Sequence, residues 1–189
     1  MAFTHCTVDC IRALQASNPD YMKQYDKIVK IHIELGEAAF HHGGFVAQRP
    51  IASIGAQMSN AYVVATQIIC GQVMPSQFRS DQLEREDIWR LVNLTSCELN
   101  KELTKIWTQR VTIQFEDGKE IVQYLDKQKG VDTPLSNEEI LEKFRMVLDG
   151  VVDNERRDKI ADFILDIESK KDMDVLINLL SPLTKNPIA

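Results

Sequence analysis

The residue of this sequence whose type and position could do acid–base chemistry is His5. His5 lies at or just before a predicted helix start, where unpaired backbone N–H groups and the helix dipole disfavour a positive charge. We therefore expect a neutral imidazole that accepts a proton or donates a hydrogen bond. The alternative is a histidine on a frayed chain end.

A pair of polar residues, Ser59 and Tyr62, lies three positions apart in a strongly apolar helical pattern. The two side chains share a face, so the phenol could donate to a carboxylate or carbonyl while the serine assists. Gln57 is a weaker neighbour of the same pair. Tyr62 also lies within the apolar stripe, so burial in the core with one polar partner explains it equally well.

Arg49 precedes that helix in the segment Arg49-Pro50-Ile51, where it could hold a carboxylate bidentately. A solvated loop charge is the alternative. His41 and His42 suggest metal at first glance, but adjacent side chains diverge and no carboxylate or thiolate lies at ligand spacing. We therefore predict no metal site. Nucleotide-binding and other cofactor motifs are missing from the sequence, so we predict no cofactor either.

The composition is that of a soluble globular protein: 44% of the 189 residues are hydrophobic, 26% are charged and the formal net charge is −6. We expect one domain over residues 1–189. Without a basic cluster, neither nucleic acid nor an anionic membrane surface is an expected partner. The sequence shows no signal peptide or membrane span, and its four cysteines fit buried thiols, so we expect a cytoplasmic protein.

The elements that must position these residues alternate between helical and strand patterns. Residues 29–35 alternate as a half-buried strand, and residues 107–125 form a hairpin that turns at Asp117-Gly118. Residues 41–44 are predicted to be a loop. The mixed order with one hairpin predicts an α+β fold. Helices are predicted at 6–17, 51–70, 85–94, 136–150, 156–169 and 172–180, the fourth of these with a capping box at Ser136 and Glu139.

Several of these segments together resemble the C-terminal domain of the MmgE/PrpD superfamily, and most closely its cis-aconitate decarboxylase branch. The similarity is strongest over Arg49–Phe78 and includes Thr4–Asp9 and Val111–Gly118. It implies the family's lid-domain fold, a small mixed sheet with a hairpin packed against several helices. It also implies that the family's larger helical half, which supplies most of the acid–base groups, has no counterpart in this sequence.

The resemblance also implies site residues. His5 and Asp9 match a histidine and an acidic residue at the start of a family helix, where the histidine faces the substrate from the lid side. Ser59 and Tyr62 match a serine and a tyrosine near the active-site cleft. His5 and Tyr62 are therefore the expected catalytic residues, with Ser59, Arg49, Gln57 and Asp9 binding the substrate.

Three functions are compatible with these expectations. The first is a stand-alone, cofactor-independent enzyme of secondary metabolism that guides an isomerisation, cyclisation or elimination of a small carbonyl- or carboxylate-bearing molecule. The second is one half of a split lyase completed by another chain. The third is a non-catalytic binding or regulatory protein. A face uncovered by loss of the helical half could also form a homodimer.

Overall fold

The structure, a computed structural model, describes residues 1–132 and 134–188. It divides into two compact units, here called the sheet unit (Met1–Val73 and Gln77–Pro134) and the C-terminal helical unit (Met74–Ser76 and Leu135–Ala189). The expected single domain over residues 1–189 stays a prediction. Among the described residues, no helix is both long and apolar enough to cross a membrane.

The described part of the sheet unit contains a four-stranded mixed sheet in the order β2-β1-β3-β4. The central strand β1 (Ile28–Leu35) runs parallel to β2 (Thr95–Leu99) and antiparallel to β3 (Gln109–Phe115). The hairpin partner of β3 is β4 (Glu120–Leu125), and Gly118 takes the positive φ of +83° that their turn requires. The predicted α+β class and hairpin are thereby confirmed, whereas β2 was not predicted.

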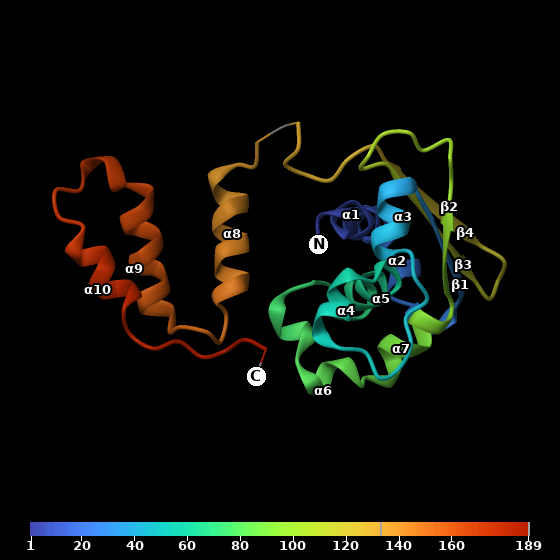
Figure 1. The fold of residues 1–189 in the computed structure, drawn as a ribbon, viewed down its shortest axis with the longest axis horizontal. Coiled ribbons are helices and arrows are strands. Elements are labelled where there is room, and N and C mark those ends of the chain that lie inside the picture. Colours follow the sequence, from blue (N-terminus) through green and yellow to red (C-terminus); the bar gives the residue numbers. More distant parts are fainter. Residues whose placement is uncertain (133, 189) are drawn as a thin grey trace. The chain divides into compact units, whose positions relative to one another are not determined.

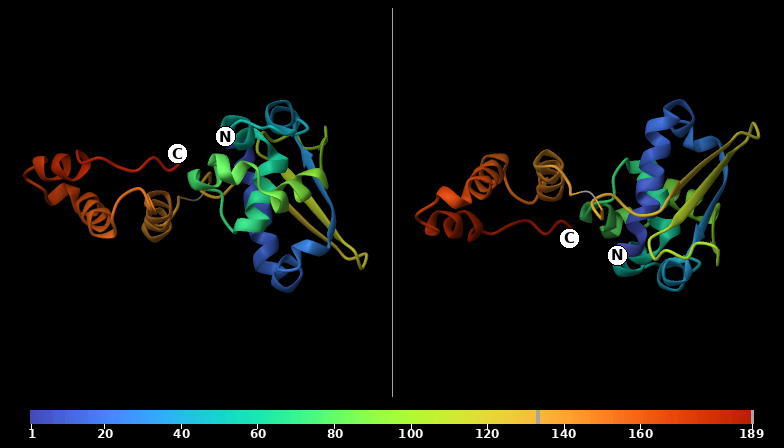
Figure 2. Two further views of the ribbon diagram at one scale, coloured as in Figure 1. Left: turned by 90° about the horizontal axis from the view of Figure 1, so that it is seen from below. Right: turned by 90° about the horizontal axis from the view of Figure 1, so that it is seen from above.

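Helices cover the face of the sheet that carries the odd-numbered residues of β1 and β3 (Figures 1 and 2). Side chains such as Ile31, Ile33, Val111 and Ile113 are fully buried there, because alternate strand residues point to the same face. Two helices, α1 (Ala2–Ser17) and α5 (Asn60–Cys70), form most of this layer. The other helices in the described part of the unit are α2 (Pro19–Met22), α3 (Glu37–Gly43), α4 (Ser53–Met58), α6 (Ser80–Leu83) and α7 (Glu86–Asn93), with a short 3-10 turn at Tyr25–Lys27. A second 3-10 turn, at Pro75–Phe78, begins in the segment assigned to the C-terminal helical unit.

Three predicted boundaries are wrong, each for a local physical reason. The first helix begins at Ala2 rather than at residue 6, because the Thr4 side chain and backbone both bond to the Met1 carbonyl. The predicted helix 51–70 is interrupted at Ser59, whose extended backbone separates α4 from α5. The predicted loop at residues 41–44 includes the last turn of α3, where histidines suit the negative end of the helix dipole.

The C-terminal helical unit consists of α8 (Asn137–Leu148), α9 (Asn154–Leu165), a 3-10 turn at Ile167–Ser169 and α10 (Asp174–Leu180). The predicted capping box at Ser136 and Glu139 is confirmed at the start of α8. Arg156 on α9 donates to carbonyls at and beyond the end of α10, including Leu179 at 2.6 Å and Pro182 at 2.9 Å. The buried core of this unit is small and comprises Ile160, Phe163 and Leu176, with Phe144 and Leu179 packed against them.

Candidate functional site

His5 lies in the first turn of α1, and its side chain is exposed although the neighbouring residues are buried. Thr4 and Cys6, on either side of it, point into the core, so the helix presents the imidazole outward from a packed support. The position near a helix N-terminus agrees with the sequence-based expectation. An exposed imidazole on a rigid turn can transfer a proton to or from a molecule that approaches this face.

Asp9 is one helical turn after His5 and contacts the segment that follows β4. Its Oδ2 accepts a hydrogen bond from the Lys129 backbone N–H at 2.9 Å, and its Oδ1 lies 3.5 Å from Arg12. The carboxylate therefore holds the chain after the hairpin against α1. The predicted role of Asp9 in substrate binding stays a prediction, and the structure gives this carboxylate a local structural role.

A buried polar network fixes the first turns of α1 to the rest of the sheet unit. The Thr7 hydroxyl donates to Asn60 Oδ1 at 2.6 Å and also contacts the side-chain oxygen of Gln109. Asn60 in turn donates to the Gly43 carbonyl at 3.1 Å, and Gln109 donates to the Phe3 carbonyl at 2.5 Å. All three polar side chains are buried, where hydrogen-bond partners are required.

The sequence analysis missed this network. Its only signal is a polar residue at the edge of an apolar pattern, as at Asn60 before Ala61 and at Gln109 before Val111. A polar residue at this place is also typical of the exposed end of a helix or strand, so the sequence pattern could not distinguish a buried polar side chain from an exposed one. The network nevertheless anchors the part of α1 that carries His5.

Ser59 and Tyr62 both lie in the core rather than on an open surface. Ser59 is the N-cap of α5, and its hydroxyl accepts a hydrogen bond from the Tyr62 backbone N–H at 3.2 Å. The Tyr62 side chain is 0% exposed and packs against Phe78 and Trp89, with ring centres 6.2 and 6.0 Å away. This placement agrees with the core alternative, and direct substrate contact by either residue stays a prediction.

The phenol of Tyr62 donates a hydrogen bond to the Gln82 backbone carbonyl at 3.2 Å. Burial raises the pKa of Tyr62 from 10.0 to about 12, because removal from water disfavours the phenolate. The hydroxyl is therefore protonated at neutral pH, and its one proton is engaged by the Gln82 carbonyl. This geometry favours a role in holding α5 and the segment around residue 82 together.

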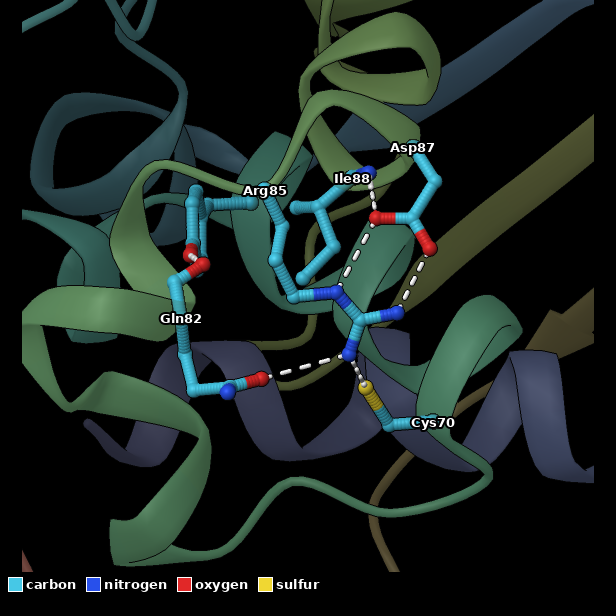
Figure 3. A network of polar contacts seen from close by, with 6 residues as sticks. Cys70, Gln82, Arg85, Asp87 and Ile88 are labelled. Atoms are coloured by element: carbon cyan, nitrogen blue, oxygen red, sulfur yellow. Dashed lines mark hydrogen bonds and ion pairs between the residues drawn. The ribbon is translucent and has the colours of Figure 1, made fainter.

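Gln82 also links Tyr62 to a charged network around Arg85, because its backbone carbonyl accepts from Tyr62 and its side chain accepts from Arg85. Figure 3 shows the contacts of Arg85 with Gln82, Asp87 and Cys70. The Arg85 guanidinium binds both carboxylate oxygens of Asp87, at 3.0 and 2.5 Å, and also donates to Gln82 Oε1 at 3.2 Å and to the Cys70 sulfur at 3.4 Å. The hydrogen bonds from Arg85 lower the pKa of Asp87. Burial raises the pKa of the Cys70 thiol, which Arg85 partly counteracts.

Arg49 borders a hollow of about 510 Å³ between the segment 46–49 and α7. Its guanidinium lies 5.0 Å from the centre of the Trp89 ring, and its Nη1 is 2.6 Å from the Glu86 carboxylate. The side chain is therefore held in place rather than freely solvated. The residues lining the hollow are Val46, Ala47, Gln48, Arg49, Glu86, Trp89, Arg90 and Asn93.

The predicted site residues fall into separate groups. Tyr62 and Arg49 both contact Trp89, Tyr62 from the core and Arg49 from the surface. His5 and Asp9 lie on α1, which the Thr7–Asn60 hydrogen bond joins to the start of α5. Gln57 lies on α4 and donates to Ser53 Oγ at 3.2 Å. In the described part of the chain, no cluster of three or more histidine, cysteine or acidic side chains could hold a metal ion.

Comparison with known proteins places this architecture in context. Residues 1–168 match the profile of the MmgE/PrpD C-terminal domain, which is most of the chain. The matched range covers the whole sheet unit as well as α8 and α9.

Curated fungal relatives show the same similarity. A cis-aconitate decarboxylase-like protein, oryM, of Aspergillus oryzae is 32% identical over 94% of this chain and 38% of its own length. A cis-aconitate decarboxylase of Aspergillus terreus is 33% identical over 97% of this chain and 39% of its own length. The chain therefore spans less than two-fifths of these relatives.

Proposed function

This chain belongs to the MmgE/PrpD family through the C-terminal domain, and on that premise we propose that it contributes one side of a lyase active site for a small carboxylate-bearing molecule. The observation that carries the proposal is the placement of His5. The imidazole is exposed on the first turn of α1, while the turn itself is anchored by buried hydrogen bonds from Thr7 and Gln109.

The proposed role of His5 is proton transfer at the carbon atom next to the carboxylate. Loss of water or carbon dioxide from such a molecule requires a proton to be removed from or delivered to that carbon. A single positioned acid or base contributes roughly 10²- to 10⁴-fold to a rate, which is less than a complete lyase site supplies. The remaining groups would come from a counterpart of the region that this chain does not span, within a longer protein or on a second chain.

Under this proposal, the buried residues Tyr62 and Ser59 do not contact the substrate and instead hold the helix that supports His5 in place. Tyr62 and Ser59 would fix the start of α5, to which Asn60 joins α1 through Thr7. Their loss would then lower activity by displacing the support of His5 rather than by removing a group that touches the substrate. Rigid support matters because catalysis depends strongly on small displacements of a reacting group.

The test reconstitutes the two halves with a substrate taken from the relatives. The chain is mixed with the part of the A. terreus enzyme that lies outside the similarity, and carbon dioxide release from cis-aconitate is measured. We expect His5→Gln to lower kcat by about 10²- to 10⁴-fold, because the variant loses the proton-transferring group. The matched control is His41→Gln, which removes another exposed histidine on a helix of the same unit. Equal activity of His5→Gln and the unsubstituted chain would refute the role of His5.

A second candidate function is supported by the hollow beside Arg49. A cavity of about 510 Å³ lies in the range of small-molecule sites, roughly 300–1,000 Å³. In this case the chain would act alone and guide an isomerisation, cyclisation or elimination by shape and hydrogen bonding. The two functions differ in one measurement: the second requires turnover of a carboxylate-bearing metabolite by the isolated chain, and the first requires the added half.

A further inference from the structure

The hollow beside Arg49 is lined by the Arg49 guanidinium, by the solvent-exposed carboxylate of Glu86 and by the Trp89 ring. Trp89 is only 3% exposed, and its indole N–H donates to the Leu83 carbonyl at 2.7 Å. The Arg49 guanidinium lies over this immobile ring. Stacking on an aromatic face fixes the plane of a guanidinium and directs its N–H groups within that plane. Arg49 Nη2 donates to the Glu84 carbonyl at 3.3 Å, so Nη1 is the group that can bind a carboxylate.

The second cation of the hollow is Arg90, one residue after Trp89. Its guanidinium donates to the backbone carbonyls of Ile28, at 3.3 Å, and Tyr25, at 2.5 Å. Carbonyl groups carry no net charge, so these bonds hold the side chain without neutralising it. Arg49 and Arg90 thus place two positive charges on the border of one hollow.

Glu86 already occupies the binding edge of Arg49. Its carboxylate lies 2.6 Å from Arg49 Nη1, yet the Glu86 side chain is 84% exposed. An ion pair that faces water contributes little, because both partners are well solvated when they separate. A carboxylate on a ligand that also contacts the walls of the hollow can therefore displace Glu86 from Arg49.

We propose that this hollow binds a small organic monocarboxylate, whose carboxylate replaces that of Glu86 on Arg49 and whose hydrocarbon part lies against Val46 and Ala47. The volume of about 510 Å³ suits a metabolite rather than a macromolecule. Gln48 and Asn93 add amide groups that can bond to a further polar atom of the ligand. This inference rests on the second candidate function and specifies the class of ligand that the hollow binds. It concerns binding only, so it does not depend on proton transfer by His5.

The two tryptophans of the chain provide a site-specific readout with an internal reference. In a ¹H–¹⁵N spectrum of the full chain, titration with sodium hexanoate is expected to shift the indole signal of Trp89 and to leave that of Trp107 unchanged. Trp107 packs against Phe3 and does not line the hollow. Hexanamide, which has the same hydrocarbon part without the charge, is expected to cause no shift, and sodium sulfate tests for general anion binding.

Three variants identify the residues responsible. Arg49→Gln is expected to weaken hexanoate binding by at least about tenfold. Arg49→Lys is expected to weaken it less, because lysine keeps the positive charge and lacks the planar set of N–H donors of a guanidinium. Glu86→Gln is expected to strengthen binding several-fold, since the competing carboxylate is gone. Arg79→Gln is the matched control, because Arg79 forms another exposed ion pair, with Asp81.

The inference is overturned if hexanamide and hexanoate shift Trp89 equally, if sulfate shifts it as strongly as hexanoate, or if Arg49→Gln and Arg49→Lys bind like the unsubstituted chain. Unchanged affinity in Glu86→Gln would also contradict the displacement of its carboxylate. His5→Gln is expected to bind hexanoate normally. If His5→Gln loses turnover and still binds hexanoate, proton transfer by His5 and carboxylate binding in the hollow are independent. If the unsubstituted chain shows turnover and does not bind hexanoate, only the binding proposal is refuted.

Discussion

At the scale of single residues, the same polar group acquires its role from what surrounds it. The Tyr62 hydroxyl could serve a substrate only if it faced an opening, but the structure places it against the Gln82 carbonyl inside the core. The His5 imidazole, by contrast, remains exposed on a helix whose neighbouring side chains are buried. The proposed proton transfer therefore rests on His5, and the proposed contribution of Tyr62 is to stabilise the elements that support His5.

The Tyr62 hydroxyl yields a stability prediction with a defined pH dependence. Tyr62→Phe is expected to lower the free energy of unfolding by about 1 kcal/mol at neutral pH, because the Gln82 carbonyl loses a buried donor. The folded pKa of about 12 lies above the usual 10.0, so the phenol stabilises the fold below pH 10 and loses that contribution as the pH rises through the folded pKa.

Urea unfolding of both proteins at neutral and alkaline pH tests this prediction. The difference between the unsubstituted chain and Tyr62→Phe should narrow above pH 10. Tyr25→Phe is the control, because Tyr25 is exposed and its loss should change the stability little. A difference that grows with pH would show that the folded state favours the phenolate instead.

At the scale of elements, the break between α4 and α5 decides which residues can lie near one another. A single helix over residues 51–70 would keep Gln57 and Tyr62 on one continuous axis. The extended backbone of Ser59 starts α5 anew, and the first residue of α5, Asn60, bonds to Thr7 of α1. The cap thus joins the helix that carries Tyr62 to the helix that carries His5.

The cap at Ser59 leads to a second stability prediction. Ser59→Ala is expected to reduce the free energy of unfolding by about 1 kcal/mol, because the Tyr62 backbone N–H loses its acceptor at the start of α5. Ser17→Ala is a suitable control, since Ser17 is exposed at the end of α1, where its hydroxyl donates to the Ala13 carbonyl and accepts from the Asn18 side chain. Thermal unfolding measured by circular dichroism compares the two. Equal midpoints would mean that the Ser59 side chain does not stabilise α5.

At the scale of the whole molecule, the two units differ in the size of their cores. The sheet unit buries a large cluster on one face of its sheet, with Ile31, Ile33 and Ile113 fully inaccessible. The core cluster of the described part of the C-terminal helical unit consists of Ile160, Phe163 and Leu176, whereas Leu180 and Leu183 are exposed. Apolar burial is the main stabilising contribution in folded proteins, so the two units should differ in stability.

Amide hydrogen exchange tests this difference directly. We expect the amides of α9 and α10 to exchange faster than those of β1 and β3, because fewer buried contacts must break for local opening. Phe163→Ala should accelerate exchange in α9 and α10 and leave β1 and β3 unchanged, since Phe163 belongs to the small core. Protection in α9 and α10 equal to that in β3 would contradict the expected order of stability.

Features that depend on neighbouring residues could be predicted from the sequence. The alternation of β1, the hairpin with its Asp117-Gly118 turn and the capping box of α8 each arise within a short segment, so the local pattern was sufficient. A helix start next to His5 was predicted for the same reason, although the helix begins at Ala2 and includes His5.

Features that depend on distant residues were decided only by the tertiary structure. Strand β2 forms because its backbone pairs with β1, more than fifty residues earlier in the chain. The hollow exists because Arg49 meets Trp89 and Glu86 from another segment, and Tyr62 became a core residue because Phe78, Gln82 and Trp89 enclose it. The sequence by itself determined the residue types and local conformations, whereas long-range packing decided which polar groups face water and which are buried.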